Sequence, residues 1–374
     1  MKRLCTSNLI PGMIVGEDVF SHSNQLVIPK GLRLTDKTIT RLEFYSIPYV
    51  KIKDFEEEDF DVAVTVDETL SSSPKQPADN QSDNSYSDII QSSPRFQKFR
   101  QDFDDTVDTF RNNINEIVQK GAKINTDALL GQASALINSM NTQTDFFNML
   151  HNMRQYDDLT YTHCMNVALI SRILAEWLNM SKEDVQTATL CGLLHDIGKL
   201  AIPDNLIKKP SKLTDAEYKI VKTHTIEGYR ILEKQDISIH VKNAALMHHE
   251  RCDGSGYPFG INGSKIDPFA KIVGIADVYD AMTAARVYRG PLCPFQVIEI
   301  FEKEGFQKYD AAYILKFLEN VVMTYMNNRV LLSDGTKGDI VYINHAQLSR
   351  PMIKSKDKFI DLSEKPDLYI EKIL

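Results

Sequence analysis

The sequence predicts a mainly α-helical protein with a small β-rich module at its N-terminus and a short β-hairpin appended near its C-terminus. Apolar residues recur at helical spacing through most of the long central part of the chain. Helix-capping pairs precede several of those stretches. Short apolar runs separated by turn residues occur towards the two ends instead, and this is the pattern of strands.

The predicted β-rich module covers residues 1–55. Its candidate strands are Met13–Val15, Leu26–Ile28 and Tyr49–Ile52, which are separated by turn residues. One helix is predicted to begin after Thr35, where apolar residues return at helical spacing.

Residues 56–94 are predicted to be a flexible linker, because a segment dense in Ser, Asp, Asn, Gln and Pro buries too little apolar surface to offset its ordering entropy. The overlapping run 54–70 holds eight acidic residues and no Lys or Arg, so the net charge of −8 arises there. Outside this run, 43 acidic residues balance 43 basic ones. The chain therefore lacks the clustered positive charge that binding a nucleic-acid polymer needs.

Residues 95–150 are predicted to form a helical coupling segment. Phe103, Val107, Phe110 and Ile114 follow one another at helical spacing. The segment could carry signals or form a homodimer, or it could simply be a packing helix of the main domain. The sequence leaves both interpretations open.

Residues 151–324 are predicted to be the all-helical main domain. Helix N-termini are indicated by Ser181 with Asp184, Thr214 with Glu217, and Asp267 with Pro268. Residues 325–374 are predicted to be the C-terminal β appendage, with a hairpin that turns at Asp334-Gly335.

The five cysteines are odd in number and form no C-x-x-C pair, which favours a reducing compartment over a disulfide framework. The N-terminus lacks the apolar core of a signal peptide, and no run approaches the ~18 apolar residues of a membrane span. We therefore expect a cytoplasmic protein without a membrane span.

Six of the nine histidines lie between residues 163 and 249. A single inward-facing histidine is usually a satisfied core residue, but burying this many imidazoles and carboxylates without a counter-ion would be costly. A pair of divalent cations removes the difficulty. The predicted ligands are His163, His195, Asp196, His224, His248, His249 and Asp277.

In this scheme Asp196 offers one oxygen to each of two ions. His163, His195 and Asp277 complete the first site, and the remaining three histidines complete the second. Mixed imidazole and carboxylate ligands suit transition metals rather than Mg or Ca, with Fe or Mn favoured and Zn or Ni as alternatives. Two such ions activate a water and neutralise charge on a phosphoryl group. The pattern therefore indicates a metal-dependent hydrolase.

Two motifs carry a family resemblance: His195-Asp196-Ile-Gly-Lys199, and His248-His249-Glu250 followed by Asp253-Gly254-x-Gly256-Tyr257-Pro258. Together they resemble the HD-GYP branch of the HD-domain phosphohydrolases, over roughly residues 150–325. The resemblance implies an HD-type helical bundle around a metal pair. It also implies hydrolysis of cyclic di-GMP to linear pGpG, and often onward to GMP, so the end product stays open.

Carried over by position, the resemblance implies that the seven ligands named above match the family's binuclear pattern. It makes Asp196 and Lys199 the catalytic residues. The predicted substrate-binding residues are Tyr257, Arg286, Arg289, Gly254, Gly256 and Asp280. Where the family usually has Pro after the first of these arginines, this sequence has Val287.

Three functions remain open on this basis. The chain could be an active cyclic di-GMP phosphodiesterase, a non-catalytic cyclic di-GMP receptor or protein-interaction module, or a hydrolase of another cyclic dinucleotide. Residues 1–55 resemble the small domain that often precedes HD-GYP domains. We expect this module to regulate the protein or to contact a signalling partner.

Overall fold

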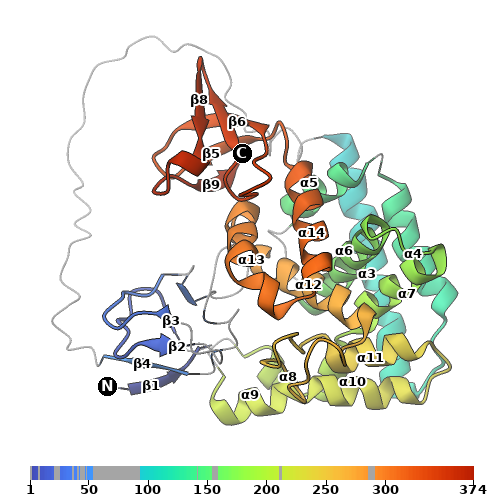
Figure 1. Ribbon diagram of the computed structural model, residues 1–374. Coiled ribbons are helices and arrows are strands. Elements are labelled where there is room, and N and C mark those ends of the chain that lie inside the picture. The colour runs from blue at the N-terminus through green and yellow to red at the C-terminus, as the bar shows by residue number, and fades with distance from the viewer. Residues whose placement is uncertain are drawn as a thin grey trace, which may run out of the picture.

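The structure is a computed structural model that describes residues 2–6, 9–20, 26–35, 38–39, 42, 47, 49–53, 93–140, 142–153, 159–209, 213–284 and 291–374. It confirms a mainly helical bundle with a small β region at the N-terminus and a β-sheet at the C-terminus (Figure 1). The predicted linker, 56–94, lies outside the described residues except for its last two positions.

The N-terminal region is built from two short antiparallel strand pairs. Strand β1 pairs with β4, and β2 pairs with β3. Their bounds are Lys2–Cys5 for β1, Val19–Phe20 for β2, Leu26–Ile28 for β3 and Tyr49–Ile52 for β4. Residues 38–39 and 42 are helical, as predicted for the segment after Thr35. Val15, Leu34 and Leu42 belong to a small apolar core that is separate from that of the helical bundle.

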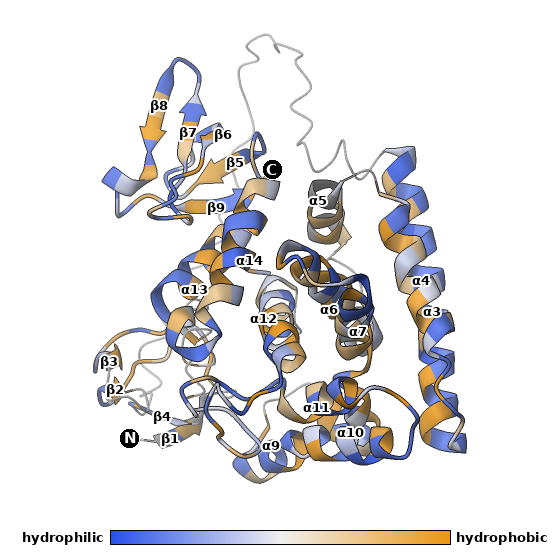
Figure 2. Cartoon of the chain, turned by 45° about the vertical axis from the view of Figure 1, so that its right-hand side comes forward, coloured by the Kyte–Doolittle hydropathy of each residue, from blue (hydrophilic) through white to orange (hydrophobic). Residues whose placement is uncertain are grey.

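Three helices follow and pack against the bundle: α3 (Pro94–Lys120), α4 (Thr126–Asn138) and α5 (Gln143–Met153). The side chain of Ser93 caps the start of α3, and Gly121, in the left-handed conformation, ends it. The apolar residues of α3 alternate with polar ones along the helix (Figure 2) and join the core shared with α6. The structure thus shows α3 as a packing helix, whereas a coupling role stays a prediction.

The central bundle contains the helices that carry the histidines. Its elements are α6 (Leu159–Trp177), α7 (Lys182–Leu194), the 3₁₀ turn η3 (Ile197–Ala201), α8 (Asp204–Ile207), α9 (Asp215–Lys222), α10 (His224–Glu233), α11 (Ile239–Met247), α12 (Pro268–Thr283), α13 (Pro294–Lys308) and α14 (Ala311–Thr324). All three predicted N-caps are confirmed, including a full capping box between Thr214 and Glu217. None of the helices in the described ranges combines the length and hydropathy needed to cross a bilayer.

The C-terminal part is larger than the predicted hairpin. It is a five-stranded antiparallel sheet in the order β8-β7-β6-β5-β9. The strands are β5 (Arg329–Leu332), β6 (Lys337–Tyr342), β7 (Met352–Ser355), β8 (Lys358–Asp361) and β9 (Ile370–Ile373), and the 3₁₀ turn η4 (Leu362–Glu364) follows β8. The hairpin itself, β5 to β6, turns at Gly335 as predicted. Arg350 lies 3.2 Å from Glu299 of α13 and so links the sheet to the bundle.

Candidate metal centre

The structure brings the seven predicted ligands together, although they come from five different elements. His163 lies within α6, His195 and Asp196 follow α7, His224 begins α10, His248 and His249 follow α11, and Asp277 lies within α12. Two groups have ligand atoms within 4.8 Å of one another: the first group is Asp196 with His163 and His195, and the second group is Asp196 with His224, His248 and His249. Asp277 lies outside both groups but is 3.0 Å from Nε2 of His163. We call these seven residues the histidine cluster.

Asp196 lies between the two groups. Its Oδ2 is 3.2 Å from Nε2 of His195 and 3.8 Å from Nε2 of His163. Its Oδ1 faces the other way, 3.4 Å from Nε2 of His224 and 3.7 Å from Nε2 of His248. A carboxylate in this position can offer one oxygen to each of two cations.

Backbone carbonyl groups orient three of the imidazoles. Nδ1 of His195 donates to the carbonyl of Gly192, Nδ1 of His224 to that of Val221, and Nδ1 of His248 to that of Ala244. These bonds place a proton on Nδ1 of each ring and leave Nε2 facing Asp196. Metal-binding histidines are commonly held by such a bond on the second ring nitrogen.

Burial keeps the second group of histidines neutral. Desolvation lowers the pKa of His224 to about 4 and that of His248 to about 3. The pKa of His249 is also lowered well below its usual value, by burial and by neighbouring His248. Neutral imidazole is the form that binds a metal ion, so these side chains are ready to act as ligands.

His163 is held differently, because two carboxylates flank its ring. Burial opposes the charged form, but hydrogen bonds raise the pKa of His163 to about 9; Asp277 lies 3.0 Å from Nε2 and Asp280 lies 2.7 Å from Nδ1. Despite burial, His163 and the other neighbouring histidines hold the pKa of Asp277 well below its usual range. A cation bound at Nε2 of His163 would therefore displace a proton.

The donor set fits a metal pair. Nε2 of His195 and Oδ1 of Asp196 are buried and have no hydrogen-bond partner among the described residues. Buried polar atoms are rarely left unsatisfied, and a cation at each of the two sites would satisfy them. Lys199 forms an ion pair with Oδ2 of Asp196. Against the cost of burial, Lys199 is the first of the charges that hold the pKa of Asp196 well below its usual value.

Three glycines allow the helices of the cluster to approach closely. A Cβ on Gly192 would lie 2.5 Å from Cα of Ala168, where α7 meets α6. A Cβ on Gly198 would lie 1.9 Å from the carbonyl oxygen of His224, and one on Gly274 would lie 2.8 Å from that of His248. Sequence reasoning missed all three, although glycine within an apolar helical stretch is a known sign of close packing.

The loop after His249 is held by Glu250, which the sequence did not assign to the site either. Its two carboxylate oxygens accept hydrogen bonds from the backbone N–H groups of Phe259 and Ile261, at 2.7 and 3.1 Å. A Cβ on Gly256 would lie 2.4 Å from Cα of Glu250. Gly256 is thus required by the loop's own packing, and its predicted approach to a ligand stays a prediction.

Of the other predicted substrate-binding residues, the structure describes Tyr257, Gly254 and Asp280. Tyr257 stacks on His249, with ring centroids 4.5 Å apart. Gly254 has φ 79° and lies in the same loop. Asp280 is only 1% exposed and bonds to His163 and Asn166, so it lies behind the cluster. Arg286 and Arg289 lie outside the described residues.

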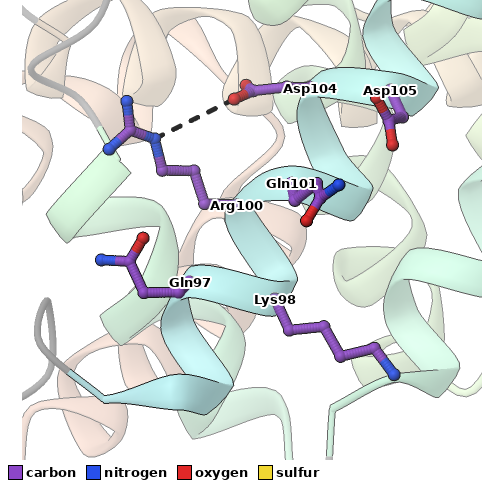
Figure 3. Close-up of a pocket in the computed structure, with 6 residues that line it drawn as sticks. All are labelled: Gln97, Lys98, Arg100, Gln101, Asp104 and Asp105. Atoms are coloured by element: carbon purple, nitrogen blue, oxygen red, sulfur yellow. Dashed lines mark ion pairs between the residues drawn. The ribbon is translucent and has the colours of Figure 1, made fainter.

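A surface hollow on α3 offers no competing site. It is lined by six polar residues of that single helix (Figure 3): Gln97, Lys98, Arg100, Gln101, Asp104 and Asp105. Arg100 and Asp104 form an ion pair of 3.9 Å with both side chains substantially exposed, and such a pair contributes little.

Comparison with known proteins agrees with this geometry. Residues 132–313 match the family model of the HD domain, and the match begins inside α4. This match spans just under half of the chain, and that region is therefore similar to an HD domain. The sequence Gly256-Tyr257-Pro258 after His248-His249 resembles the motif of the HD-GYP branch.

Three curated relatives are similar to this chain. The cyclic di-GMP phosphodiesterase PA4108 of Pseudomonas aeruginosa is 35% identical over 204 residues, which are 54% of this chain and 49% of that protein. The cyclic di-GMP phosphodiesterase of Thermotoga maritima is 40% identical over 150 residues, 39% of this chain and 41% of that protein. The 3'3'-cGAMP-specific phosphodiesterase 1 of Vibrio cholerae is 39% identical over 145 residues, 39% of this chain and 34% of that protein. The chain thus spans half or less of the length of these relatives.

Proposed function

We propose that this chain is a cyclic di-GMP phosphodiesterase that hydrolyses the 3'-5' phosphodiester to pGpG, with GMP as the alternative end product. The observation that carries the proposal is the position of Asp196, whose two oxygens face two separate groups of histidines. The names of two relatives, both cyclic di-GMP phosphodiesterases, support the substrate class.

The histidine cluster would hold two divalent transition-metal ions, Fe or Mn in the first place and Zn or Ni as alternatives. One ion would be bound by His163, His195 and Asp277, the other by His224, His248 and His249, and Asp196 would bridge them. Bound ions would supply Lewis acidity and activate a water for attack on the phosphodiester.

The remaining residues would bind and orient the substrate. The ammonium of Lys199 lies at the cluster with its side chain 26% exposed, so it can reach a phosphate as well as Asp196. Burial raises the pKa of Tyr257 well above its usual value, so its ring remains neutral and suited to stacking on a base. Asp280 would orient His163 through Nδ1. Arg286 and Arg289 are proposed to bind phosphate.

The test is turnover by the purified chain loaded with Mn or Fe, with pGpG and GMP separated by chromatography. We expect His195→Ala and Asp196→Ala to abolish turnover and to lower the metal content. His240→Ala is the matched control, because His240 pairs with Asp267 outside the cluster and its side chain is 42% exposed. Normal turnover in either cluster variant would refute the site.

A second candidate substrate is 3'3'-cGAMP, which is favoured by the name of the Vibrio cholerae relative. A panel of cyclic di-GMP, 3'3'-cGAMP and cyclic di-AMP decides between the two by kcat/KM. Tight binding without turnover of any of them would instead identify a non-catalytic receptor.

We also propose that residues 1–55 form a regulatory unit. The separate apolar core of this region supports the idea, because a region with its own core can respond to a partner without unpacking the helical bundle.

A further inference from the structure

Lys222, the last residue of α9, lies between two tyrosine rings beside the histidine cluster. Its Nζ is 5.1 Å from the ring centroid of Tyr218 and 5.5 Å from that of Tyr257. Both distances are within the range of a cation–π contact. We call Tyr218, Lys222 and Tyr257 the aromatic shelf.

The shelf adjoins the cluster through Tyr257. The ring of Tyr257 stacks on His249 at an interplanar angle of 28°, and it meets the ring of His224 edge-on with centroids 6.4 Å apart. A cyclic dinucleotide whose phosphate lies at the cluster carries its bases one ribose away from that phosphate. The shelf therefore lies where a base would be expected.

The ammonium of Lys222 is available to a ligand. Within the described ranges no carboxylate lies at ion-pair distance from it, whereas Lys209 pairs with Glu217 of α9 at 2.6 Å. The side chain of Lys222 is also only partly exposed, while that of Lys219, one turn earlier, is exposed. A partly desolvated cation without a counter-ion favours a hydrogen-bond acceptor on a bound molecule.

We propose that Lys222 is a specificity-determining residue that donates hydrogen bonds to N7 and O6 of a guanine stacked on the aromatic shelf. This inference rests on the proposed function and names the residue that selects the base. Guanine presents two acceptors on the edge that a lysine reads, whereas adenine presents one acceptor beside an amino donor. A lysine in this position therefore favours guanine over adenine.

The alternative for an unpaired lysine is a contact with the second phosphate. The surroundings argue for the base, because the ammonium lies over ring faces, and stacking on aromatic rings is how proteins hold unpaired bases. The two roles predict different selectivity. A base-reading lysine discriminates between cyclic dinucleotides, but a phosphate-binding lysine affects all of them equally.

The test compares Lys222→Met and Lys222→Arg with the wild-type chain and with Lys219→Met as the matched control. The metal-loaded proteins are assayed with cyclic di-GMP, 3'3'-cGAMP and cyclic di-AMP, and binding of each is measured by calorimetry. We expect Lys222→Met to lower the preference for cyclic di-GMP over cyclic di-AMP by roughly ten- to a hundredfold. Lys222→Arg should retain the preference, since arginine reads the same guanine edge, and Lys219→Met should leave it unchanged.

Metal content and melting temperature of Lys222→Met report whether the cluster and the fold are intact. An equal loss for all three dinucleotides, or an unchanged preference, would overturn the inference while leaving the proposed function in place. If the wild-type chain binds these ligands but hydrolyses none, the proposed function fails. The calorimetric preference then still decides the role of Lys222.

As a second variant, Tyr218→Leu removes one ring of the shelf without removing the ammonium. Stacking tolerates every base, so affinity should fall by a similar factor for all three ligands. A change of base preference in Tyr218→Leu that equals the change in Lys222→Met would count against a direct contact between Lys222 and the base.

Discussion

His163, on one side of Asp196, and His224 and His248, on the other side, are held in place by different means. On one side, His163 is flanked by the carboxylates of Asp277 and Asp280, which keep it charged. On the other side, Nδ1 of His224 and Nδ1 of His248 bond to backbone carbonyls, and burial keeps both rings neutral.

This difference has a consequence for substitutions. The carboxylates of Asp277 and Asp280 orient His163. A point mutation of either aspartate therefore removes a hydrogen bond to the ring without changing His163 itself. The carbonyls that orient His224 and His248 belong to the helix backbone, and no side-chain replacement removes them. His224 and His248 should therefore be disturbed mainly by changes that move a helix.

Replacing Asp196 should have the largest effect, because its carboxylate is the part of the cluster that faces both groups of histidines. Asp196→Asn keeps the shape but exchanges one oxygen for an amide that cannot bind a cation. We expect both ions to be lost and turnover to fall by at least roughly 10²–10³-fold, the cost of removing one group that stabilises a transition state. His163→Ala and His248→Ala should each lose one ion. Elemental analysis checks this, and Asp196→Asn with both ions retained would contradict the bridging position.

Gly198→Ala should displace His224 and so disturb only the second group of histidines, leaving His163 and His195 in place. The new Cβ would lie 1.9 Å from the carbonyl oxygen of His224, so α10 must move away from Asp196. Overpacking of this kind costs about 1–3 kcal/mol of unfolding free energy, and more where both sides are backbone. Denaturant titration measures the loss, and metal analysis should show the ion of His224 and His248 lost first.

Gly228→Ala is the control for this prediction. Gly228 faces Gly198 across the same contact, but a Cβ there meets nothing closer than 3.4 Å. This replacement should be tolerated. Equal destabilisation by the two alanines would show that the close approach of η3 to α10 is not what holds His224 in place.

These glycines also show where prediction from sequence stopped. The seven candidate ligands could be predicted because imidazoles and carboxylates are costly to bury, and the structure does bring these side chains together. Gly192, Gly198 and Gly274 could not be assigned, because their requirement depends on which backbone lies opposite. That partner is far away in sequence, as Ala168 is from Gly192.

The C-terminal sheet illustrates a different difficulty. Its hairpin was predicted because Asp334-Gly335 is a strong local turn signal. Strands β7, β8 and β9 have only four residues each, and so short a stretch shows too little alternation to be distinguished from a loop. Their stability comes from pairing in the sheet, which the local sequence does not reveal.

Asp280→Asn should weaken the first group without moving a helix. The amide can still bond to His163, but it no longer supplies the negative charge that polarises the imidazole through Nδ1. We expect metal affinity at His163 to fall by about 10- to 100-fold, with the site of His224 and His248 unchanged. In competition with a chelator, the bound metal should therefore be released in two kinetic phases instead of one. A uniform loss at both sites would show that Asp280 supports the whole cluster.

Gly131→Ala should have the smallest effect, and it sharpens the comparison by testing a helical glycine that no other segment of the described ranges approaches. A Cβ at this position in α4 meets nothing within 4 Å, and the residue is exposed. Alanine loses less backbone entropy on folding than glycine, so the chain should gain about 0.5–1 kcal/mol of unfolding free energy. Thermal denaturation should show a rise of roughly 2–4 °C per kcal/mol, with metal content unchanged. A loss of stability would mean that α4 approaches another part of the chain more closely than the structure shows.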